Sequence, residues 1–216
     1  MTNPQLFLRL DNLEAKYKTD GRLKELLVKA SLNRIKKDEV AELQQIVKRI
    51  DVQSSLLGFV FNSLLLNLNV SDRDIVQLSN VSNQRISKIT DESISLLEEK
   101  KTGPEALQNV LASSLIRQSF TKGQSFLADK KNVGFKTWVR TGSSKTGEIR
   151  PHSNLERKTI ARDDLFTLPS GSRVIAPHDW TASNPKREWV NCRHACLYHP
   201  FSSTEEFRAF IRSKKV

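Results

Sequence analysis

The chain has 216 residues, which is enough for one large or two small domains with a buried core. Lys and Arg (35) outnumber Asp and Glu (24), giving a formal net charge of +11, while 38% hydrophobic residues exclude global disorder. The chain has only two cysteines, and its N-terminus has no basic stretch followed by an apolar segment. Both features argue against a secreted disulfide scaffold. The most apolar run, 56–68, is broken by polar residues and shorter than the roughly 20 residues a membrane span needs. We therefore expect a buried helix there and no membrane partner.

The positive charge is unevenly distributed along the chain. Residues 1–104 carry a net +2, whereas residues 105–216 carry a net +9. A basic half of this kind favours a polyanionic partner, and double-stranded DNA is the obvious one, because cationic side chains attract phosphates and release counterions. The alternative is that the excess charge serves solubility alone.

The first hundred residues are expected to be helical, because apolar residues recur there at steps of three and four. There are two such sets, and the residues of each set would lie on one face of a helix. The first is Leu23, Leu26, Leu27, Ala30 and Ile35, and the second is Val40, Leu43, Ile46, Val47 and Ile50. Asp38 is the expected N-cap of the second helix. Glycine interrupts this region only at Gly21 and Gly58 before Gly103, so strands are not expected.

Residues 71–89 resemble a helix-turn-helix, the motif with which many proteins read DNA. Ser71 would cap a first helix, and Asn80 would take the left-handed backbone conformation in the turn. The apolar residues of this helix would face inward: Ile75, Val76 and Leu78.

In the second helix of this motif, Ser82 would be the N-cap and Val81 would fill the angle between the helices. Ile86 and Ile89 would be buried. The outward side chains would then be of types that contact bases and phosphates: Asn83, Gln84, Arg85 and Lys88. The alternative is an ordinary helical hairpin whose polar residues are merely solvated.

The triplet 102–104 (Thr-Gly-Pro) predicts a boundary, since proline is favoured at the first position of a helix. A long helix should follow over 105–128. After Lys131, short β-prone runs at 135–139, 165–168, 173–175 and 188–190 alternate with turn residues, and Gly171 should close a hairpin. A last helix should begin at Ser203. The expected fold class is α+β, with a helical domain at 1–103 and a second domain at 104–216 that holds a long helix, a small antiparallel sheet and a C-terminal helix.

Four residues of the second domain form the ligand set of a tetrahedral zinc ion: His152, Cys192, His194 and Cys196. In a strand, residues 192, 194 and 196 would project from one face. His178 and His199 are further candidates. The alternative is that Cys192 is a small buried residue without a metal. A Cys192 nucleophile with His152 as base, or an RNase-like His/Arg site, is chemically conceivable, but no spacing singles either out, and we expect no enzymatic activity.

The order of the blocks in residues 138–196 resembles the head-morphogenesis family typified by the F protein of phage Mu, the minor head proteins of tailed bacteriophages. In that family a Trp-led strand precedes an Arg/His block, then a Leu-Pro-x-Gly loop, then a terminal Asn-Cys-Arg-Cys. The matching residues here are Trp138, Arg150, His152, Gly171, Asn191, Cys192 and Arg193. His194 stands where the family has its second cysteine, and Arg117-Gln118-Ser119 keeps only the arginine of an Arg-Thr-Glu block.

The resemblance implies a minor component inside the capsid near the portal, present in the host cytoplasm during assembly. Its partners would be portal, capsid or scaffold proteins and DNA, bound without sequence preference, and it would assist head morphogenesis and DNA packaging or ejection. No small-molecule substrate is implied. Arg140, Arg150 and Arg193 would contact phosphates. The rival expectation is a DNA-binding regulator that reads an operator through residues 71–89, with a C-terminal domain that could hold zinc.

Overall fold

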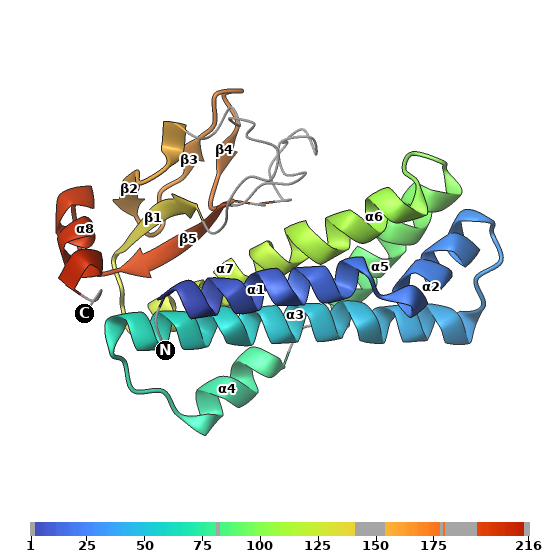
Figure 1. The fold of residues 1–216 in the computed structure, drawn as a ribbon, viewed down its shortest axis with the longest axis horizontal. Coiled ribbons are helices and arrows are strands. Elements are labelled where there is room, and N and C mark those ends of the chain that lie inside the picture. Colours follow the sequence, from blue (N-terminus) through green and yellow to red (C-terminus); the bar gives the residue numbers. More distant parts are fainter. Residues whose placement is uncertain (1–2, 81–82, 141–153, 178, 180–193, 214–216) are drawn as a thin grey trace.

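The computed structural model describes residues 3–80, 83–140, 154–177, 179 and 194–213. Long helices lie alongside one another and a small β unit covers one end of them (Figure 1). The described part of the chain thus confirms the α+β prediction. None of its helices is long and apolar enough to cross a membrane.

The elements follow the chain in this order: α1 (Asn3–Lys18), α2 (Gly21–Ser31), α3 (Lys37–Leu66), α4 (Asp72–Ser79), α5 (Asn83–Glu98), α6 (Pro104–Val110), the π-helical turn η1 (Leu111–Leu115), α7 (Ile116–Lys130), β1 (Phe135–Arg140), β2 (Thr159–Ala161), β3 (Phe166–Thr167), β4 (Arg173–Val174), β5 (His194–His199) and α8 (Thr204–Ser213).

The two predicted helices of the first half are present, and the second is longer than expected. Four of the five residues predicted for the first face, Leu23, Leu26, Leu27 and Ala30, are buried in α2, whereas Ile35 lies beyond the end of this helix and is half-buried. Helix α3 runs for 30 residues, because it joins the predicted second helix to the apolar run 56–68. Its N-cap is Lys36 rather than Asp38, and Glu39 accepts a hydrogen bond from the backbone N–H of Lys36. The prediction of Asp38 as the cap was therefore wrong by two residues.

Helices α3 and α7 lie unusually close together. A Cβ on Gly58 would be 1.9 Å from the carbonyl oxygen of Phe120, and one on Gly123 would be 1.8 Å from the carbonyl oxygen of Ser55. Since no real Cβ makes such a contact, both glycines are required for the two backbones to touch. Gly58 is thus a packing residue inside a continuous helix and does not interrupt it.

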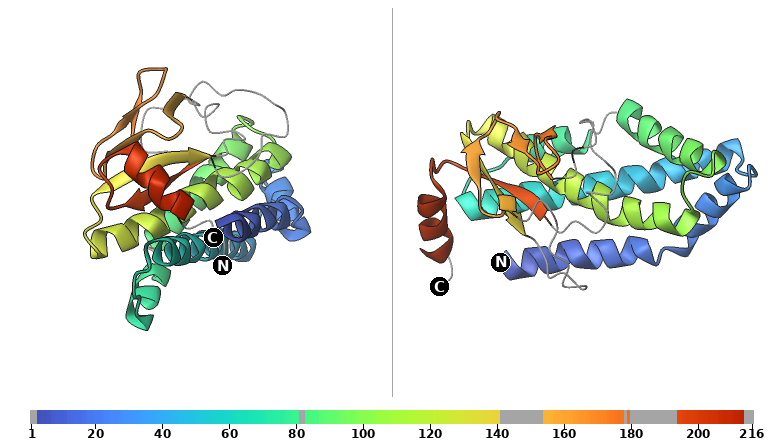
Figure 2. Two further views of the ribbon diagram at one scale, coloured as in Figure 1. Left: turned by 60° about the vertical axis from the view of Figure 1, so that its left-hand side comes forward. Right: turned by 90° about the horizontal axis from the view of Figure 1, so that it is seen from above.

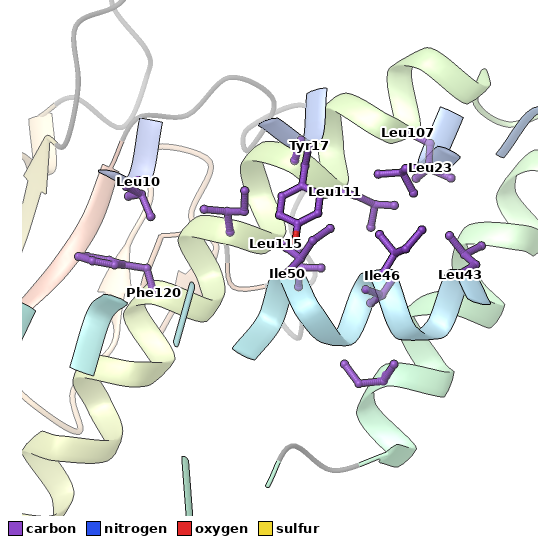
Figure 3. Packing of buried hydrophobic residues seen from close by; sticks show 14 of the residues in the cluster. Leu10, Tyr17, Leu23, Leu43, Ile46, Ile50, Leu107, Leu111, Leu115 and Phe120 are labelled. Atoms are coloured by element: carbon purple, nitrogen blue, oxygen red, sulfur yellow. The ribbon is translucent and has the colours of Figure 1, made fainter. Parts of the chain in front are cut away.

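The helices share one large core, whose centre is shown in Figure 3. Side chains of α1, α2, α3 and the long helix α6–η1–α7 meet there, among them Tyr17, Ile50 and Phe120. The same core includes Ala195 and Leu197 of β5 and Phe207 of α8. It therefore contains residues from both sides of the predicted domain boundary at 103/104.

The long helix begins as predicted, with Pro104 as its first residue and Gly103 as its N-cap. The π-helical turn η1 lies within it and is fully buried. Such turns insert one extra residue into a helix and rotate the side chains that follow. Here the residues that follow include Arg117, whose side chain is fully buried against α1.

The β unit contains a three-stranded antiparallel sheet in the order β2-β1-β5 and a separate hairpin, β3-β4. Residues Ala195 and Leu197 face the helical core, whereas Cys196 and Tyr198 face a second core beneath the hairpin. Trp138 lies at the centre of this second core, fully buried, with its ring edge-on to Phe166 at a centroid distance of 5.0 Å. The sheet is thus covered on both faces (Figure 2).

Two turn predictions in this unit are confirmed. Gly171 has φ +83° in the loop between β3 and β4, a conformation that favours glycine. At the start of α8, the Ser203 hydroxyl accepts the N–H of Glu206 and the Glu206 carboxylate accepts the N–H of Ser203. The predicted strand at 188–190 lies outside the described residues.

Candidate functional site

Strand β5 places two of the predicted zinc ligands on one face, as the alternation of residues in a strand requires. His194 is buried, and its Nε2 atom lies 2.9 Å from a carboxylate oxygen of Glu156. Cys196 is fully buried opposite Trp138, and burial raises the pKa of its thiol to about 12. The thiol is therefore protonated at neutral pH in the arrangement described here.

The other two predicted ligands, His152 and Cys192, lie outside the described residues. Within the described ones, no three His, Cys, Asp or Glu side chains are grouped so that they could hold a metal ion. His194 and Cys196 have packing roles that need no metal, beside Trp138 and within the hairpin core. The zinc site stays a prediction, and the positions of His194 and Cys196 give it no further support.

His199 is the most completely enclosed histidine of the described residues, and its protonation state follows from its contacts. The backbone N–H of Phe201 donates to Nδ1 (3.3 Å), so this nitrogen carries no proton. Nε2 must then carry the hydrogen that bridges to the Thr137 hydroxyl at 2.6 Å. The ring also stacks on Phe207 of α8 at a centroid distance of 4.0 Å. A neutral imidazole thus joins β5, β1 and α8.

The chain of hydrogen bonds continues beyond His199. The Thr137 hydroxyl lies 2.7 Å from that of Thr159, which lies 3.0 Å from that of Thr204, and Thr204 donates to the carbonyl of Arg157. The Thr204 hydroxyl is the donor to both Thr159 and Arg157, so its single hydrogen is shared between these two acceptors. The series ties the start of α8 to all three strands of the sheet.

We expect acid to weaken the fold through His199. Burial lowers the pKa of this imidazole from 6.5 to about 4. Between these values the unfolded chain binds a proton that the folded chain does not, so stability is lost as the pH falls from 6.5 towards 4. The urea midpoint should therefore drop between pH 7 and pH 5, and drop less in His199→Phe. Equal drops in both proteins would contradict this role; burial also lowers the pKa of His194, so some decline should remain in the variant.

Lys136 is a buried cation that sequence analysis did not identify. It lies in β1 opposite Tyr198, fully buried, with its Nζ atom 5.5 Å from the centre of the Phe166 ring. No hydrogen-bond partner of this amine is found among the described residues, and burial lowers its pKa. Only the fold could reveal it, since a lysine in an alternating strand is ordinarily assigned to the solvent face.

The segment predicted as a helix-turn-helix forms two helices that differ from the motif. Ser71 caps α4 as expected, through the N–H of Asp74, and Leu78 is buried. However, Ile75 and Val76 are 37% and 58% exposed, so their predicted inward packing was wrong. Asn80 has φ −72° rather than a left-handed backbone. Val81 and Ser82 lie outside the described residues.

The second helix of this segment, α5, buries Ile86 and half-buries Ile89 as expected. Gln84 and Lys88 are exposed, whereas the side chain of Asn83 is outside the described set. The motif requires its two helices to pack on one another; here α4 and α5 both pack against α3, and α5 also packs against α2.

The predicted outward direction of Arg85 was also wrong. Its guanidinium donates to Asp51 (3.2 Å) and to Gln118 (3.1 Å). Asp51 is fully buried in α3 and accepts two further hydrogen bonds, from the hydroxyl of Ser119 and the amine of Lys122. This cluster joins α3, α5 and α7, and Arg85 shares with Lys122 the role of pairing with the buried carboxylate of Asp51.

Three further arginines were predicted to contact phosphates. Arg140, at the end of β1, is exposed and pairs in register with His194. Arg150 and Arg193 lie outside the described residues. By sequence, segments 141–153, 180–193 and 214–216 carry a net +5 of the +9 of the C-terminal half. More than half of the net positive charge that is proposed to contact DNA therefore lies beyond the part of the chain that the structure describes.

A cavity of about 380 Å³ lies between α7 and the chain that follows β4. The residues that line it include Lys122, Asp129, Asp179 and Tyr198. These groups carry both signs of charge, and Lys122 is already paired with Asp51. The lining therefore singles out no class of ligand.

No protein-family model matches the chain, and neither a curated protein nor a solved structure matches it.

Proposed function

We propose that the protein is a minor head protein of a tailed bacteriophage, carried inside the capsid near the portal. It would bind the packaged DNA without sequence preference and assist head morphogenesis and DNA packaging or ejection. The observation that carries the proposal is that the two family-motif residues within the described part of the chain, Trp138 of β1 and Gly171 of the β3–β4 loop, belong to one small unit. Arg150, His152 and residues 191–193 lie outside the described residues.

The placement of Trp138 and Gly171 in one unit supports reading these two blocks as parts of one module. Trp138 packs edge-on to Phe166 of the hairpin and pairs in register with Cys196 of β5. Gly171 lets the hairpin fold back over this tryptophan.

The arginine retained from the family's Arg-Thr-Glu block has a structural place that fits the same proposal. Arg117 is fully buried and donates to Glu14 (2.9 Å) and Asp11 (3.2 Å) of α1. It fixes the long helix, and with it the β unit, to the N-terminal helices. The module would thus be held rigidly on a helical region that can face other head proteins.

The proposed DNA binding rests on positive charge rather than on a motif that recognises bases. Because α4 and α5 do not pack as a helix-turn-helix, they give no support for base-specific contacts. The net charge of +9 in residues 105–216 suits contacts with phosphates. Such contacts need no reaction, and the proposal includes none.

The affinity for DNA is expected to fall steeply with salt and to be indifferent to sequence. A variant with Arg150→Gln, Lys186→Gln, Arg187→Gln and Arg193→Gln should bind at least about tenfold more weakly and show a shallower salt slope, by up to ~0.9 per lost phosphate contact. Fluorescence anisotropy with duplexes of unrelated sequence measures both.

The matched control removes the same charge from exposed positions of the first half: Lys24→Gln, Arg34→Gln, Lys37→Gln and Arg49→Gln. It should bind nearly as the wild type does. Equal weakening of both variants would mean that net charge alone is sensed, and a strong preference for one palindrome would favour the regulator instead.

A further inference from the structure

Helix α4 projects from the flank of α3 and is attached there by one apolar side chain (Figures 1 and 2). Of its eight residues only Leu78 is buried, whereas α2, with 11 residues, buries four. Leu78 packs with Phe59 of α3 and Leu127 of α7 in a small cluster that is separate from the large helical core. The burial of one leucine is thus the main apolar contribution that keeps α4 in place.

The second attachment of α4 is electrostatic and comes from Lys130, the last residue of α7. Its amine donates to the Asp74 carboxylate and to the side-chain oxygen of Gln77, and it lies 5.0 Å from the centre of the Phe126 ring. Asp74 also accepts the backbone N–H and the hydroxyl of Ser71 in the capping box of α4. The same carboxylate therefore caps the helix and attaches it to α7.

The chain that leads into α4 has no regular structure. Helix α3 ends at Leu66, and Leu68 still packs on the small cluster that contains Leu78. Asn69 and Val70, which follow, are exposed and belong to no helix or strand. The backbone can therefore turn at these two residues without disturbing α3.

We propose that α4 is a releasable flap, which leaves α3 and α7 as one unit while the rest of the protein stays folded. Release is a property of the fold and does not depend on the proposed function. Because isolated helices shorter than roughly 12 residues are marginal in water, α4 would lose its helical structure when it leaves. Local opening of this kind occurs in elements that bury few apolar contacts.

Release would change two neighbouring parts of the protein. It would uncover part of Phe59 and Leu127, both fully buried when α4 is in place. It would also free the amine of Lys130, which lies over Phe126. Since Phe126 lines the cavity beside α7, release of the flap would loosen one wall of that cavity.

Hydrogen exchange of the full chain, followed for each amide by NMR, tests the release. The amides of residues 76–80 should have protection factors at least about a hundredfold lower than the slowest amides of α3. Low concentrations of urea should leave their exchange nearly unchanged, because release exposes little surface. Asp51→Ala, which destabilises the body of the protein, should speed the slowest amides of α3 and leave those of α4 as they are.

Variants of the two attachments test what holds the flap. In Leu78→Ala the α4 amides should exchange at least about tenfold faster than in wild type, because the buried leucine is lost. In Lys130→Met, which keeps the length of the side chain without its charge, they should exchange about two- to fivefold faster at low salt. Arg73→Gln, at an exposed position of the same helix, is the matched control and should change these rates by less than about twofold.

Two results would overturn the proposal. If the amides of α4 and α3 were equally protected and both exchanged faster in Asp51→Ala, α4 would open only when the whole protein unfolds. If α4 exchanged rapidly in wild type and Leu78→Ala left its rates unchanged, Leu78 would not hold the helix to α3 and α7.

Discussion

Gly123→Ala is expected to lower the free energy of unfolding by about 3 kcal/mol or more, although alanine favours helices over glycine by up to ~1 kcal/mol. The added methyl group would lie 1.8 Å from the Ser55 carbonyl oxygen, which belongs to the backbone of α3 and cannot turn aside. Helices α3 and α7 would have to separate along the seam that supports both the helical core and the β unit. Urea denaturation followed by circular dichroism measures the change.

Gly134→Ala is the matched control for this substitution. Gly134 precedes β1, has no positive φ, and an added Cβ would meet no atom within 4 Å. Its unfolding free energy should change by less than ~0.5 kcal/mol. A Gly123→Ala protein as stable as this control would show that the two helices do not touch as described.

Asp51→Ala is expected to be the second most damaging substitution, with a loss of about 3 kcal/mol. The change removes a fully buried carboxylate and leaves the cations of Arg85 and Lys122 without their partner. Losing one member of a fully buried ion pair costs 3–5 kcal/mol. The expected loss lies at the lower end because the Arg85 and Lys122 side chains are 32% and 35% exposed and can turn towards water.

Asp91→Ala removes an exposed carboxylate from α5 and serves as the comparison. It should leave stability within ~0.5 kcal/mol of the wild type. If both aspartate variants lost the same small amount, the cluster would not contribute to holding α3, α5 and α7 together, and Arg85 would be free for another role.

The helices were predictable because their signals are local. Steps of three and four placed the buried face of α2, and Pro104 marked the start of the long helix. The structural role of Gly58 could not be predicted in this way. A glycine within an apolar run is interpreted from the sequence as an interruption of a helix. Only the position of α7 reveals that Gly58 is required for contact between two backbones.

Strand β5 was absent from the predicted β-prone runs, although the zinc hypothesis considered residues 192–196 as a strand, because its signal is not local. All six of its residues are buried, since one face lies on the helical core and the other beneath the hairpin. Burial on both faces removes the alternation of apolar and polar residues by which a strand is recognised. Its histidines and cysteine suggested metal ligands because of their residue types. Within the described fold, His199 and Cys196 serve packing and hydrogen bonding instead.

The helix-turn-helix prediction failed at the packing of its first helix. The spacing of Ile75, Val76 and Leu78 fits burial on a partner helix, but α4 inserts only Leu78 between α3 and α7. Sequence spacing defines which residues share a face and not which neighbour covers it.

Mass spectrometry of gradient-purified particles and their precursors from the source tests the account most directly. If the protein is a minor head protein, its peptides should be present in heads at a few copies per particle, in amounts that rise with the portal protein across the gradient. Finding the chain only in the soluble fraction, in neither mature nor precursor heads, would contradict it.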